Sequence, residues 1–284
     1  MRALVIGASG FLGTAVVREL TARGHDVVGS SRGRRGYLRL DVTDPIACRE
    51  VLERGRFDSV VNLAAVGVTA GTSSDHEMNV VNSMGAAVFA RAMSELATPP
   101  WFVHASSSTE HTGNGTAEST YSTTKAAGTT ATESQLRLAG LAHSIVRIHN
   151  TYGPDQPEGR FVMAAVTKLR RREQFTLNFP ARVRDFCFAD DVVRHLADLL
   201  ETPHRSATFR EIGSGTGMTL EDASRLISER VGAPAELVLI NTTTASDPNP
   251  SQVADASSPD FLECATSFQD GIDALVSRLI ARGR

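Results

Sequence analysis

Cysteine is scarce in this chain, and the three that occur, Cys48, Cys187 and Cys264, are far apart in the sequence. Their odd number and wide separation match neither the paired spacing of a zinc site nor a disulfide framework. Cysteine usage of this kind is typical of proteins kept in a reducing compartment. We therefore expect a cytoplasmic protein with no metal site.

Long apolar runs and a strong excess of one charge are also absent. The apolar segment 3–6 is too short for a signal peptide, and nothing approaches the roughly 20 apolar residues of a membrane span. The net charge of −3 gives no basic surface for nucleic acid and no acidic tail. With 284 residues, 41% of them hydrophobic, the chain can bury a substantial core in one large domain, or in a domain with a smaller lobe.

The first 150 residues alternate short apolar runs with helical patterns. Strand, helix and strand at this spacing predict right-handed crossovers and a Rossmann-like, doubly wound parallel sheet of the α/β class. The predicted strands are 3–6, 26–29, 59–63, 101–105 and 143–148, and the predicted helices are 12–23, 45–54, 80–95 and 121–138.

Beyond Asn150 the alternation is looser, and glycine- and proline-bearing loops separate the remaining patterns. Helices are predicted near 161–172, 190–201 and 220–231. The segment 242–259 is rich in Ser, Thr, Asp and Pro, and is predicted to be an irregular loop. We expect this part of the chain to contribute a smaller C-terminal lobe.

A glycine-rich segment, GASGFLG, follows the first predicted strand and opens the first predicted helix. Glycine permits positive φ and close approach of the backbone to a pyrophosphate, and a helix N-terminus offers N–H groups to the anion. A tight turn without a ligand would also explain the glycines, but the βαβ pattern that follows favours a dinucleotide site. The candidate residues are Gly7, Ser9, Gly10, Phe11, Leu12 and Gly13.

The end of the second predicted strand bears on the choice of dinucleotide. An acid there would bind the adenosine ribose and repel a 2′-phosphate, whereas this chain has Ser31 and Arg32 in the segment GSSRGRR. A hydroxyl beside a guanidinium can bind and neutralise that phosphate. We therefore favour NADP(H), with NAD(H) possible and a solvated basic loop as the alternative. Asp41 could contact the amino group of the adenine, or it could cap a helix.

Tyr121 and Lys125 are four residues apart in the predicted helix 121–138, and so share one of its faces. A phenol has a pKa near 10, and it exchanges protons near neutrality only if that pKa falls by about three. A fall of this size corresponds to about 4 kcal/mol. A unit charge about 4 Å away supplies this much at an effective dielectric near 20. The pair could also arise by chance. Small neighbours leave room for a cofactor and substrate, namely Ser122, Thr123, Ala126 and Gly128.

Together these motifs resemble the extended branch of the short-chain dehydrogenase/reductase family, the nucleotide-sugar epimerases, dehydratases and reductases. Three later segments carry the resemblance further. RIHNTYGP at 147–154 is similar to the family's R-x-x-N-x-Y-G-P, RDFCFADDV at 184–192 to its R-D-F-x-x-x-x-D-V, and IGSG at 212–215 to its N-I-G-S-G. The resemblance implies an NADP-binding Rossmann domain of residues 1–150 and about 184–213, and a substrate-binding lobe of about 151–183 and 214–284.

The resemblance also implies further site residues. Ser108 takes the place of the catalytic hydroxyl, which stabilises charge on the carbonyl oxygen, with Ser107 as the competing candidate and a serine-rich turn as the alternative. If the enzyme is a dehydratase, Glu110 would abstract the proton α to a transient ketone; otherwise it is an exposed loop charge. Tyr121 would give the proton and Lys125 would lower its pKa, and both residues would also contact the cofactor. Further implied cofactor-binding residues are Val42, Leu63, Ala64, Ala65, Asn82 and His149; Asn150, Arg182 and Arg184 would bind a nucleotide diphosphate. Asn82 could equally cap a helix.

The chain departs from the family pattern in two places. Relatives commonly carry a second diphosphate-binding arginine shortly before an Asp-Pro pair, where this chain has TTTAS at 242–246. Arg182 could substitute for it. The segment between Ser108 and Tyr121 is shorter than in most relatives, which implies a more open rim of the active site.

Three functions are compatible with the resemblance. The first is NADPH-dependent reduction of a nucleotide-linked 4-keto-6-deoxyhexose, favoured by the basic loop because NADPH is commonly a consumed reductant. The second is an epimerase or 4,6-dehydratase that recycles a bound NAD(P). The third, a non-catalytic nucleotide-sensing protein, is disfavoured because Tyr121 and Lys125 are both present. Family members often dimerise through the helices predicted at 80–95 and 121–138, so we expect a homodimer, and no nucleic-acid or membrane partner.

Overall fold

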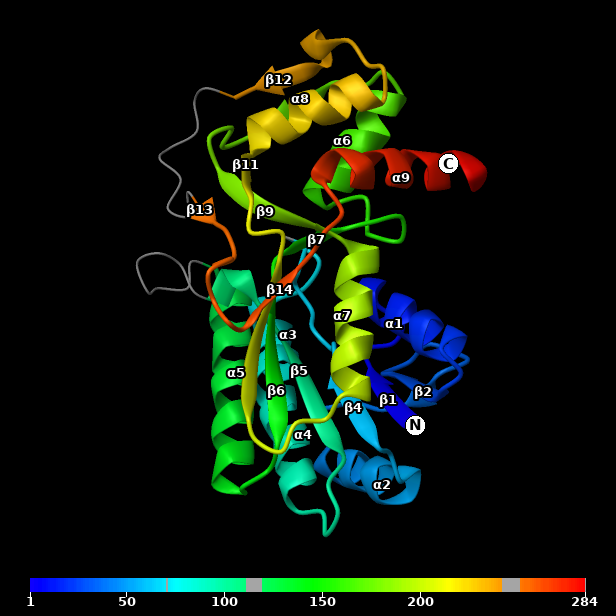
Figure 1. Cartoon of the computed structure of the whole chain (residues 1–284), viewed down its shortest axis with the longest axis vertical. Coiled ribbons are helices and arrows are strands. Elements are labelled where there is room, and N and C mark those ends of the chain that lie inside the picture. Colours follow the sequence, from blue (N-terminus) through cyan, green and yellow to red (C-terminus); the bar gives the residue numbers. More distant parts are fainter. Residues whose placement is uncertain (70, 111–118, 242–250, 284) are drawn as a thin grey trace. The chain divides into compact units, whose positions relative to one another are not determined.

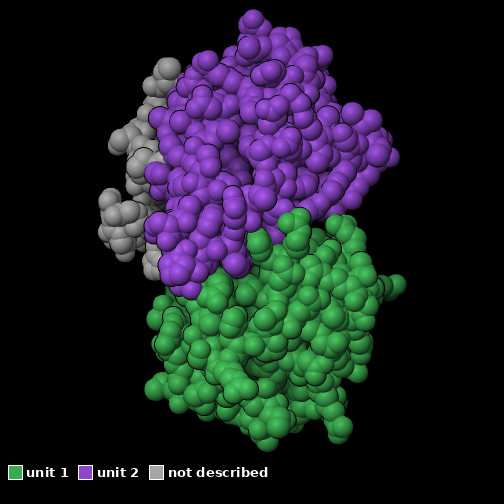
Figure 2. All heavy atoms as spheres, viewed as in Figure 1, with its two compact units in different colours: residues 1–148, 193–210 green, residues 149–192, 211–284 purple. Residues whose placement is uncertain are grey.

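The computed structural model in Figure 1 describes residues 1–69, 71–110, 119–241 and 251–283. The chain forms two compact units, which Figure 2 shows in different colours. Unit 1 comprises residues 1–148 and 193–210, and unit 2 comprises residues 149–192 and 211–284.

Unit 1 is built on a parallel sheet whose strands follow the order β6-β5-β4-β1-β2-β3. The strand order reverses between β1 and β4, and such a switch point is where doubly wound sheets bind dinucleotides. The full sheet has eight strands, with β10 (Thr208–Gly213) and β14 (Phe261–Glu263) following β6. The first six strands along the chain are β1 (Arg2–Ile6), β2 (Asp26–Ser31), β3 (Leu38–Arg39), β4 (Ser59–Asn62), β5 (Trp101–Ser107) and β6 (His143–Ile148).

Helices cover both faces of this sheet (Figure 1). On one face, α4 (Ala86–Ser94) packs between α2 (Pro45–Gly55) and α5 (Thr120–Leu138). On the other, α1 (Phe11–Ala22) lies beside α7 (Ala189–Glu201), of which residues 193–201 belong to unit 1. The doubly wound α/β fold predicted from the sequence is therefore confirmed.

The central strands of unit 1 are buried on both sides. In β1 and β4, the side chains of Leu4, Val5, Val60 and Val61 are fully excluded from solvent. Parallel strands covered by helices on both faces are expected to be continuous apolar runs. This is why the sequence predicts them without any alternation of polar residues.

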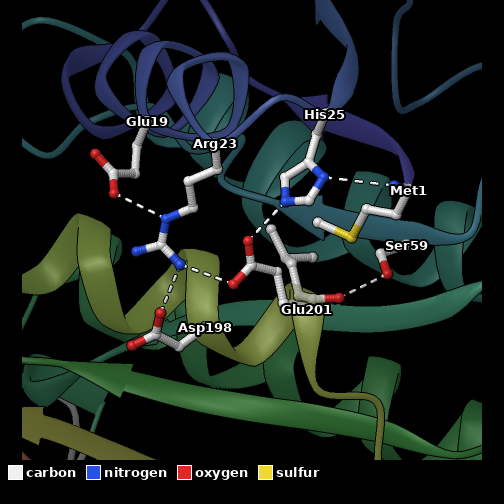
Figure 3. Close-up of polar contacts among 8 residues, drawn as sticks. Met1, Glu19, Arg23, His25, Ser59, Asp198 and Glu201 are labelled. Carbon is white, nitrogen blue, oxygen red and sulfur yellow. Dashed lines mark hydrogen bonds and ion pairs between the residues drawn. The ribbon is translucent and has the colours of Figure 1, made fainter.

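Arg23, just after α1, joins that helix to α7 through the polar contacts shown in Figure 3. Its Nε donates to Glu19 Oε1 at 2.9 Å, and its Nη1 donates to Asp198 Oδ1 at 2.6 Å and Glu201 Oε2 at 2.8 Å. Glu201 Oε1 also lies 2.6 Å from Nε2 of His25, at the start of β2. The bond with His25 first, and the contacts with Arg23 next, lower the pKa of Glu201 despite its partial burial.

In its described residues, unit 2 contains short strands and three complete α-helices around an aromatic core. Tyr152 is buried there among Phe186, Phe188 and Phe268, with ring centroids 5.2 to 6.4 Å from its own. One sheet joins β7 (Asn150–Tyr152), β9 (Val183–Phe188), β11 (Gly217–Thr219) and β13 (Ser251–Gln252), and β8 (Phe175–Leu177) pairs with β12 (Val238–Ile240). The helices are α6 (Phe161–Arg170), α8 (Leu220–Arg230) and α9 (Phe268–Ala281).

The secondary structure differs from the sequence prediction in three places. The helix predicted at 80–95 is instead a short helix α3 (Asp75–Met78), a π-helical segment Asn79–Gly85 and α4. Within 242–259, predicted to be an irregular loop, Ser251–Gln252 forms β13 beside β9, while 242–250 lie outside the described residues. The third concerns α9, which the sequence analysis did not predict. No helix in the described ranges has both the length and the apolar character needed to cross a membrane.

Candidate active site

The glycine loop lies where β1 meets α1, at the switch point of the sheet. Gly7 has φ of +76°, and a Cβ there would lie 2.9 Å from the backbone nitrogen of Ala64, after β4. A Cβ at Gly13 would overlap the carbonyl oxygen of Gly7. Gly10 is the N-cap residue of helix α1, which has no side-chain cap and no acid in its first turn. An uncapped, acid-free helix start of this kind suits a phosphate group.

Ser31 is close to the glycine loop. Ser9 Oγ donates to Ser31 Oγ at 3.2 Å, and the same oxygen accepts from the backbone N–H of Arg34 at 3.2 Å. Ser31 is buried, whereas the guanidinium side chains of Arg32, Arg34 and Arg35 are exposed. The structure thus brings one predicted phosphate-binding hydroxyl against the loop, with positive charges at the surface beside it.

Asp41 is not the cap of a helix, because Asp44 caps α2 by accepting from the N–H groups of Ile46 and Ala47. Asp41 Oδ1 instead accepts from the N–H of Thr43 at 3.0 Å and from its hydroxyl at 2.7 Å. Burial raises the pKa of Asp41, but these two bonds, with the charge of Arg32, lower it by more. Its carboxylate therefore stays ionised close to the basic loop.

Asn82 joins the loop after β4 to helix α5. Its Oδ1 accepts from the N–H of Val66 at 2.9 Å, and its Nδ2 donates to the Val66 carbonyl at 3.0 Å and to Thr124 Oγ1 at 3.2 Å. It lies inside the π-helical segment, so the alternative of a helix cap is wrong. A Cβ at Gly128 would overlap the Asn82 carbonyl oxygen, so glycine at 128 allows α5 to approach this closely.

Helix α5 carries the tyrosine and the lysine. Ser119 caps it by accepting from the N–H of Ser122 at 3.1 Å, which places half-buried Tyr121 in the first turn and buried Lys125 one turn later. Lys125 Nζ donates to the carbonyl oxygen of Ala105 at 2.7 Å. Burial lowers the pKa of Lys125, and the negative charge of Glu110 acts in the opposite direction.

Ser108 and Glu110 lie in a single 3₁₀ turn, Ser108–Glu110, directly after β5. Both are buried, and Glu110 is only 5% exposed, so the alternative of an exposed loop charge is wrong. Glu110 Oε2 accepts from Ser106 Oγ at 2.7 Å, while its Oε1 accepts from the Ser107 N–H at 3.0 Å and from Thr129 Oγ1 at 3.1 Å. This end of the strand is therefore organised around a carboxylate.

Four of the remaining predicted residues belong to unit 2. His149 Nε2 lies 2.9 Å from Glu211 Oε1, and both side chains are buried. Arg184, on β9, is buried and donates to the carbonyl of Val183 at 2.7 Å, while the Arg182 guanidinium lies 4.5 Å from the centre of the Phe179 ring. Asn150 begins β7, which pairs with β9.

Two acids of unit 2 were missed by sequence reasoning. Asp185, in the RDF segment, is fully buried and accepts from the N–H groups of Ser214 at 2.8 Å and Gly215 at 2.9 Å, and from that of Ala254 at 3.2 Å. Glu211, the partner of His149, stands where the family motif N-I-G-S-G has asparagine. That departure in the motif was the signal that could have drawn attention to Glu211.

Residues 3–213 match the sequence model of the NAD dependent epimerase/dehydratase family. This chain belongs to that family. The match confirms the resemblance predicted from the sequence, and an NAD(P)-dependent enzyme of the extended short-chain dehydrogenase/reductase type follows from it. No group of three or more His, Cys, Asp or Glu side chains in the described ranges could hold a metal ion.

Individual members of this epimerase/dehydratase family resemble the chain over most of its length. It is 27% identical over 273 residues to dTDP-6-deoxy-L-talose 4-dehydrogenase (NAD(P)(+)) of Kitasatospora kifunensis, covering 87% of this chain and 84% of that protein. It is 28% identical over 270 residues to UDP-glucose 4-epimerase of Mycolicibacterium smegmatis, covering 83% and 84%. DesIV, a dTDP-glucose 4,6-dehydratase from Streptomyces venezuelae solved with NAD and TYD bound, has a TM-score of 0.85 at 22% identity, covering 100% and 98%. At that identity the last likeness shows the fold alone.

Proposed function

We propose that this enzyme reduces a nucleotide-linked 4-keto-6-deoxyhexose with NADPH. The observation that carries the proposal is Ser31, which is bonded to Ser9 of the glycine loop and is followed by exposed Arg32, with no acid at the end of β2. A hydroxyl and a guanidinium at this point suit the 2′-phosphate of NADPH, which is commonly a consumed reductant. The relative from K. kifunensis, named as an NAD(P)-using 4-dehydrogenase of a deoxysugar nucleotide, supports the same reaction class.

In this proposal Tyr121 is the acid. NADPH supplies the hydride that adds to the carbonyl carbon, and the Tyr121 hydroxyl gives its proton to the carbonyl oxygen, leaving a phenolate that solvent reprotonates. Lys125 stabilises that phenolate and binds the nicotinamide ribose. Ser108 donates a hydrogen bond to the carbonyl oxygen as negative charge develops there.

Cofactor and substrate contacts complete the proposal. Leu63, Ala64 and Ala65, which follow β4, would lie against the cofactor, with Asn82 fixing the loop beyond them. In unit 2, we assign the nucleotide diphosphate of the substrate to Asn150, Arg182 and Arg184, because guanidinium groups bind phosphate bidentately. We also keep His149 as a cofactor contact and the homodimer as the expected assembly.

The second candidate is an epimerase or 4,6-dehydratase that keeps its NAD(P) bound. The relative from M. smegmatis, named as a UDP-glucose 4-epimerase, favours it. An enzyme of this kind purifies with its cofactor attached and forms product without any net change in nicotinamide absorbance. A non-catalytic nucleotide sensor remains the least favoured function, because both Tyr121 and Lys125 are present.

Incubation of the purified enzyme with NADPH and a panel of nucleotide sugars, some with a 4-keto group and some with a 4-hydroxyl, distinguishes the candidates. Absorbance at the nicotinamide band follows the cofactor, and chromatography of the sugar nucleotides follows the product. We expect one NADPH to be consumed for each reduced sugar formed. Product formation without NADPH consumption would assign the second candidate instead.

Replacement of Arg32 by alanine tests the choice of cofactor. Loss of one charge-assisted bond to the 2′-phosphate costs about 1.5 kcal/mol or more, so the Kd for NADPH should rise about 10-fold or more. The Kd for NADH, which lacks that phosphate, should change little. Titration of nicotinamide fluorescence gives both constants, and Arg54→Ala, at an exposed arginine on α2, is the control. An equal loss of affinity for both dinucleotides would remove Arg32 from phosphate recognition.

A further inference from the structure

A series of hydrogen-bonded polar groups connects strands β4 and β5 with helix α5. It begins at Asn62, whose Nδ2 lies 3.4 Å from Nδ1 of His104. On the other side of that ring, His104 Nε2 lies 3.4 Å from Thr129 Oγ1, which in turn lies 3.1 Å from Glu110 Oε1. Apart from partly buried Thr129, these side chains are 5% exposed or less. The sequence motifs did not predict any of these hydrogen bonds.

The donor and the acceptor of each hydrogen bond in this series can be assigned from one end to the other. The N–H of Ala64 donates to Asn62 Oδ1 at 3.1 Å, so the NH₂ group of Asn62 faces His104 and donates to its Nδ1. A neutral His104 then carries its proton on Nε2 and donates to Thr129, whose single hydroxyl proton goes to Glu110. Burial first, and then electrostatic interactions with Lys125 and His143, hold the pKa of His104 well below its ordinary value, in keeping with a neutral ring.

All three donors around Glu110 fit a carboxylate in its ionised form. Ser106 Oγ, the Ser107 N–H and Thr129 Oγ1 each donate to it, and an ionised carboxylate only accepts. A buried negative charge nevertheless requires a nearby positive one. Among the described residues, Glu110 interacts electrostatically with Lys125 on α5, and both Lys125 and His143 on β6 interact with neutral His104 on β5.

Lys125 meets this requirement because of its position. Its Nζ donates to the carbonyl of Ala105, and the next residue along β5, Ser106, donates to Glu110. On α5, Thr129 lies one turn beyond Lys125 on the same face, and it also donates to Glu110. The ammonium and the carboxylate are thus held by consecutive residues of one strand and successive turns of one helix.

We propose that Glu110 is the fixed counter-ion of Lys125, and that it acts as a positioning residue which keeps the lysine charged rather than as the base of an elimination. An elimination base must reach a substrate carbon, whereas this carboxylate is buried and accepts three hydrogen bonds. The role deepens the proposed function, since the charge on Lys125 is what acidifies Tyr121. The hydrogen bonds that link Asn62, His104 and Thr129 to Glu110 then hold the carboxylate in place.

The charge on Lys125 can be measured without any substrate. The chain contains only two lysines, Lys125 and exposed Lys168, so labelling with ¹³C-lysine gives two ε-carbon resonances, the second an internal reference. Without the negative charge, burial of Lys125 is no longer offset, so in Glu110→Gln the resonance of Lys125 should titrate at lower pH than in the unmodified enzyme. Lys168 should titrate unchanged, and Glu133→Gln, on a solvent-facing part of the same helix, should leave both resonances unmoved.

A second measurement requires no charge-removing variant, in case Glu110→Gln does not fold. In the unmodified enzyme labelled with ¹³C-glutamate, the carboxyl resonance of Glu110, assigned by its absence from Glu110→Asp, should shift with the same midpoint as Lys125. A Glu110 resonance that stays still while Lys125 titrates would overturn the proposal. So would an unchanged Lys125 titration in a folded Glu110→Gln.

Kinetics separate this inference from the proposed function. In Glu110→Gln we expect kcat for the keto sugar to fall about 10-fold at neutral pH, which is less than the loss of about 100-fold or more expected when the acid itself is removed. The KM should change less, and the upper pH limit of kcat should move to lower pH. If Lys125 titrates as expected but no 4-keto sugar is reduced, the proposed function is wrong and the counter-ion role stands. If Glu110→Gln abolishes an elimination without moving Lys125, Glu110 is the base.

Discussion

Replacing Tyr121 with phenylalanine is expected to lower kcat about 100-fold or more, in line with the loss of a positioned acid. The ring remains, so the first turn of α5 and the affinity for NADPH should be retained within a few-fold. Single-turnover reduction of the keto sugar gives the rate, and fluorescence titration gives the Kd for NADPH. The expected result is a defect in the chemical step alone.

The matched control for this variant is Tyr152→Phe. Its hydroxyl donates to the carbonyl of Phe268 at 3.3 Å inside unit 2, so its removal should cost about 1 kcal/mol of stability and leave kcat within about two-fold. An unchanged kcat in Tyr121→Phe would remove Tyr121 from the mechanism. Loss of NADPH binding together with kcat would show that the hydroxyl supports the structure instead.

The second large effect is expected at Gly13. Even alanine there would overlap the carbonyl oxygen of Gly7, so the start of α1 must move away from the position that suits a pyrophosphate. Losing two bonds to charged oxygens at about 1.5 kcal/mol each raises the Kd for a dinucleotide about 100-fold. NADPH and NADH should be affected alike, in contrast to Arg32→Ala. Fluorescence titration of Gly13→Ala with each dinucleotide checks this.

Arg18→Ala is the control for Gly13→Ala, because it changes an exposed residue of the same helix and should bind NADPH as the unmodified enzyme does. Thermal unfolding shows whether either variant has lost its fold. A folded Gly13→Ala that binds NADPH normally would place the dinucleotide away from the start of α1.

The fold of unit 1 could be predicted because each of its signals is local. Strands β1 and β4 are covered on both faces, so their residues form continuous apolar runs, and helix α2 begins at a capping aspartate followed by proline. The π-helical segment Asn79–Gly85 could not be predicted. It accompanies bonds from Asn82 to Val66, 16 residues away, and to Thr124 on another helix.

The short strands of unit 2 escaped prediction for a related reason. Strand β13 has two residues, Ser251 and Gln252, and forms only because β9 lies beside it. A pattern needs four or more residues to indicate a strand, and serine, glutamine and proline around this segment indicate a loop.

In the candidate site, too, some features are set by neighbours in the sequence and others depend on distant residues. The glycine loop, Ser31, and the spacing of Tyr121 and Lys125 are set by neighbours in the sequence, and motifs identify them. The state of Glu110 depends on Ser106 and Ser107 nearby but also on Thr129, 19 residues later, so its burial and its electrostatic interaction with Lys125 arise only in the folded chain. The sequence alone therefore does not distinguish an exposed loop charge from a buried counter-ion at Glu110.

Transfer of deuterium tests the central claim most directly. The enzyme would be given NADPH carrying deuterium at C4 of the nicotinamide, in each of its two stereoisomers, together with the accepted 4-keto sugar. The account predicts that one of the two isomers delivers its deuterium to C4 of the sugar, with one NADP⁺ formed for each product. Product without deuterium from both isomers, or deuterium at another carbon of the sugar, would contradict it.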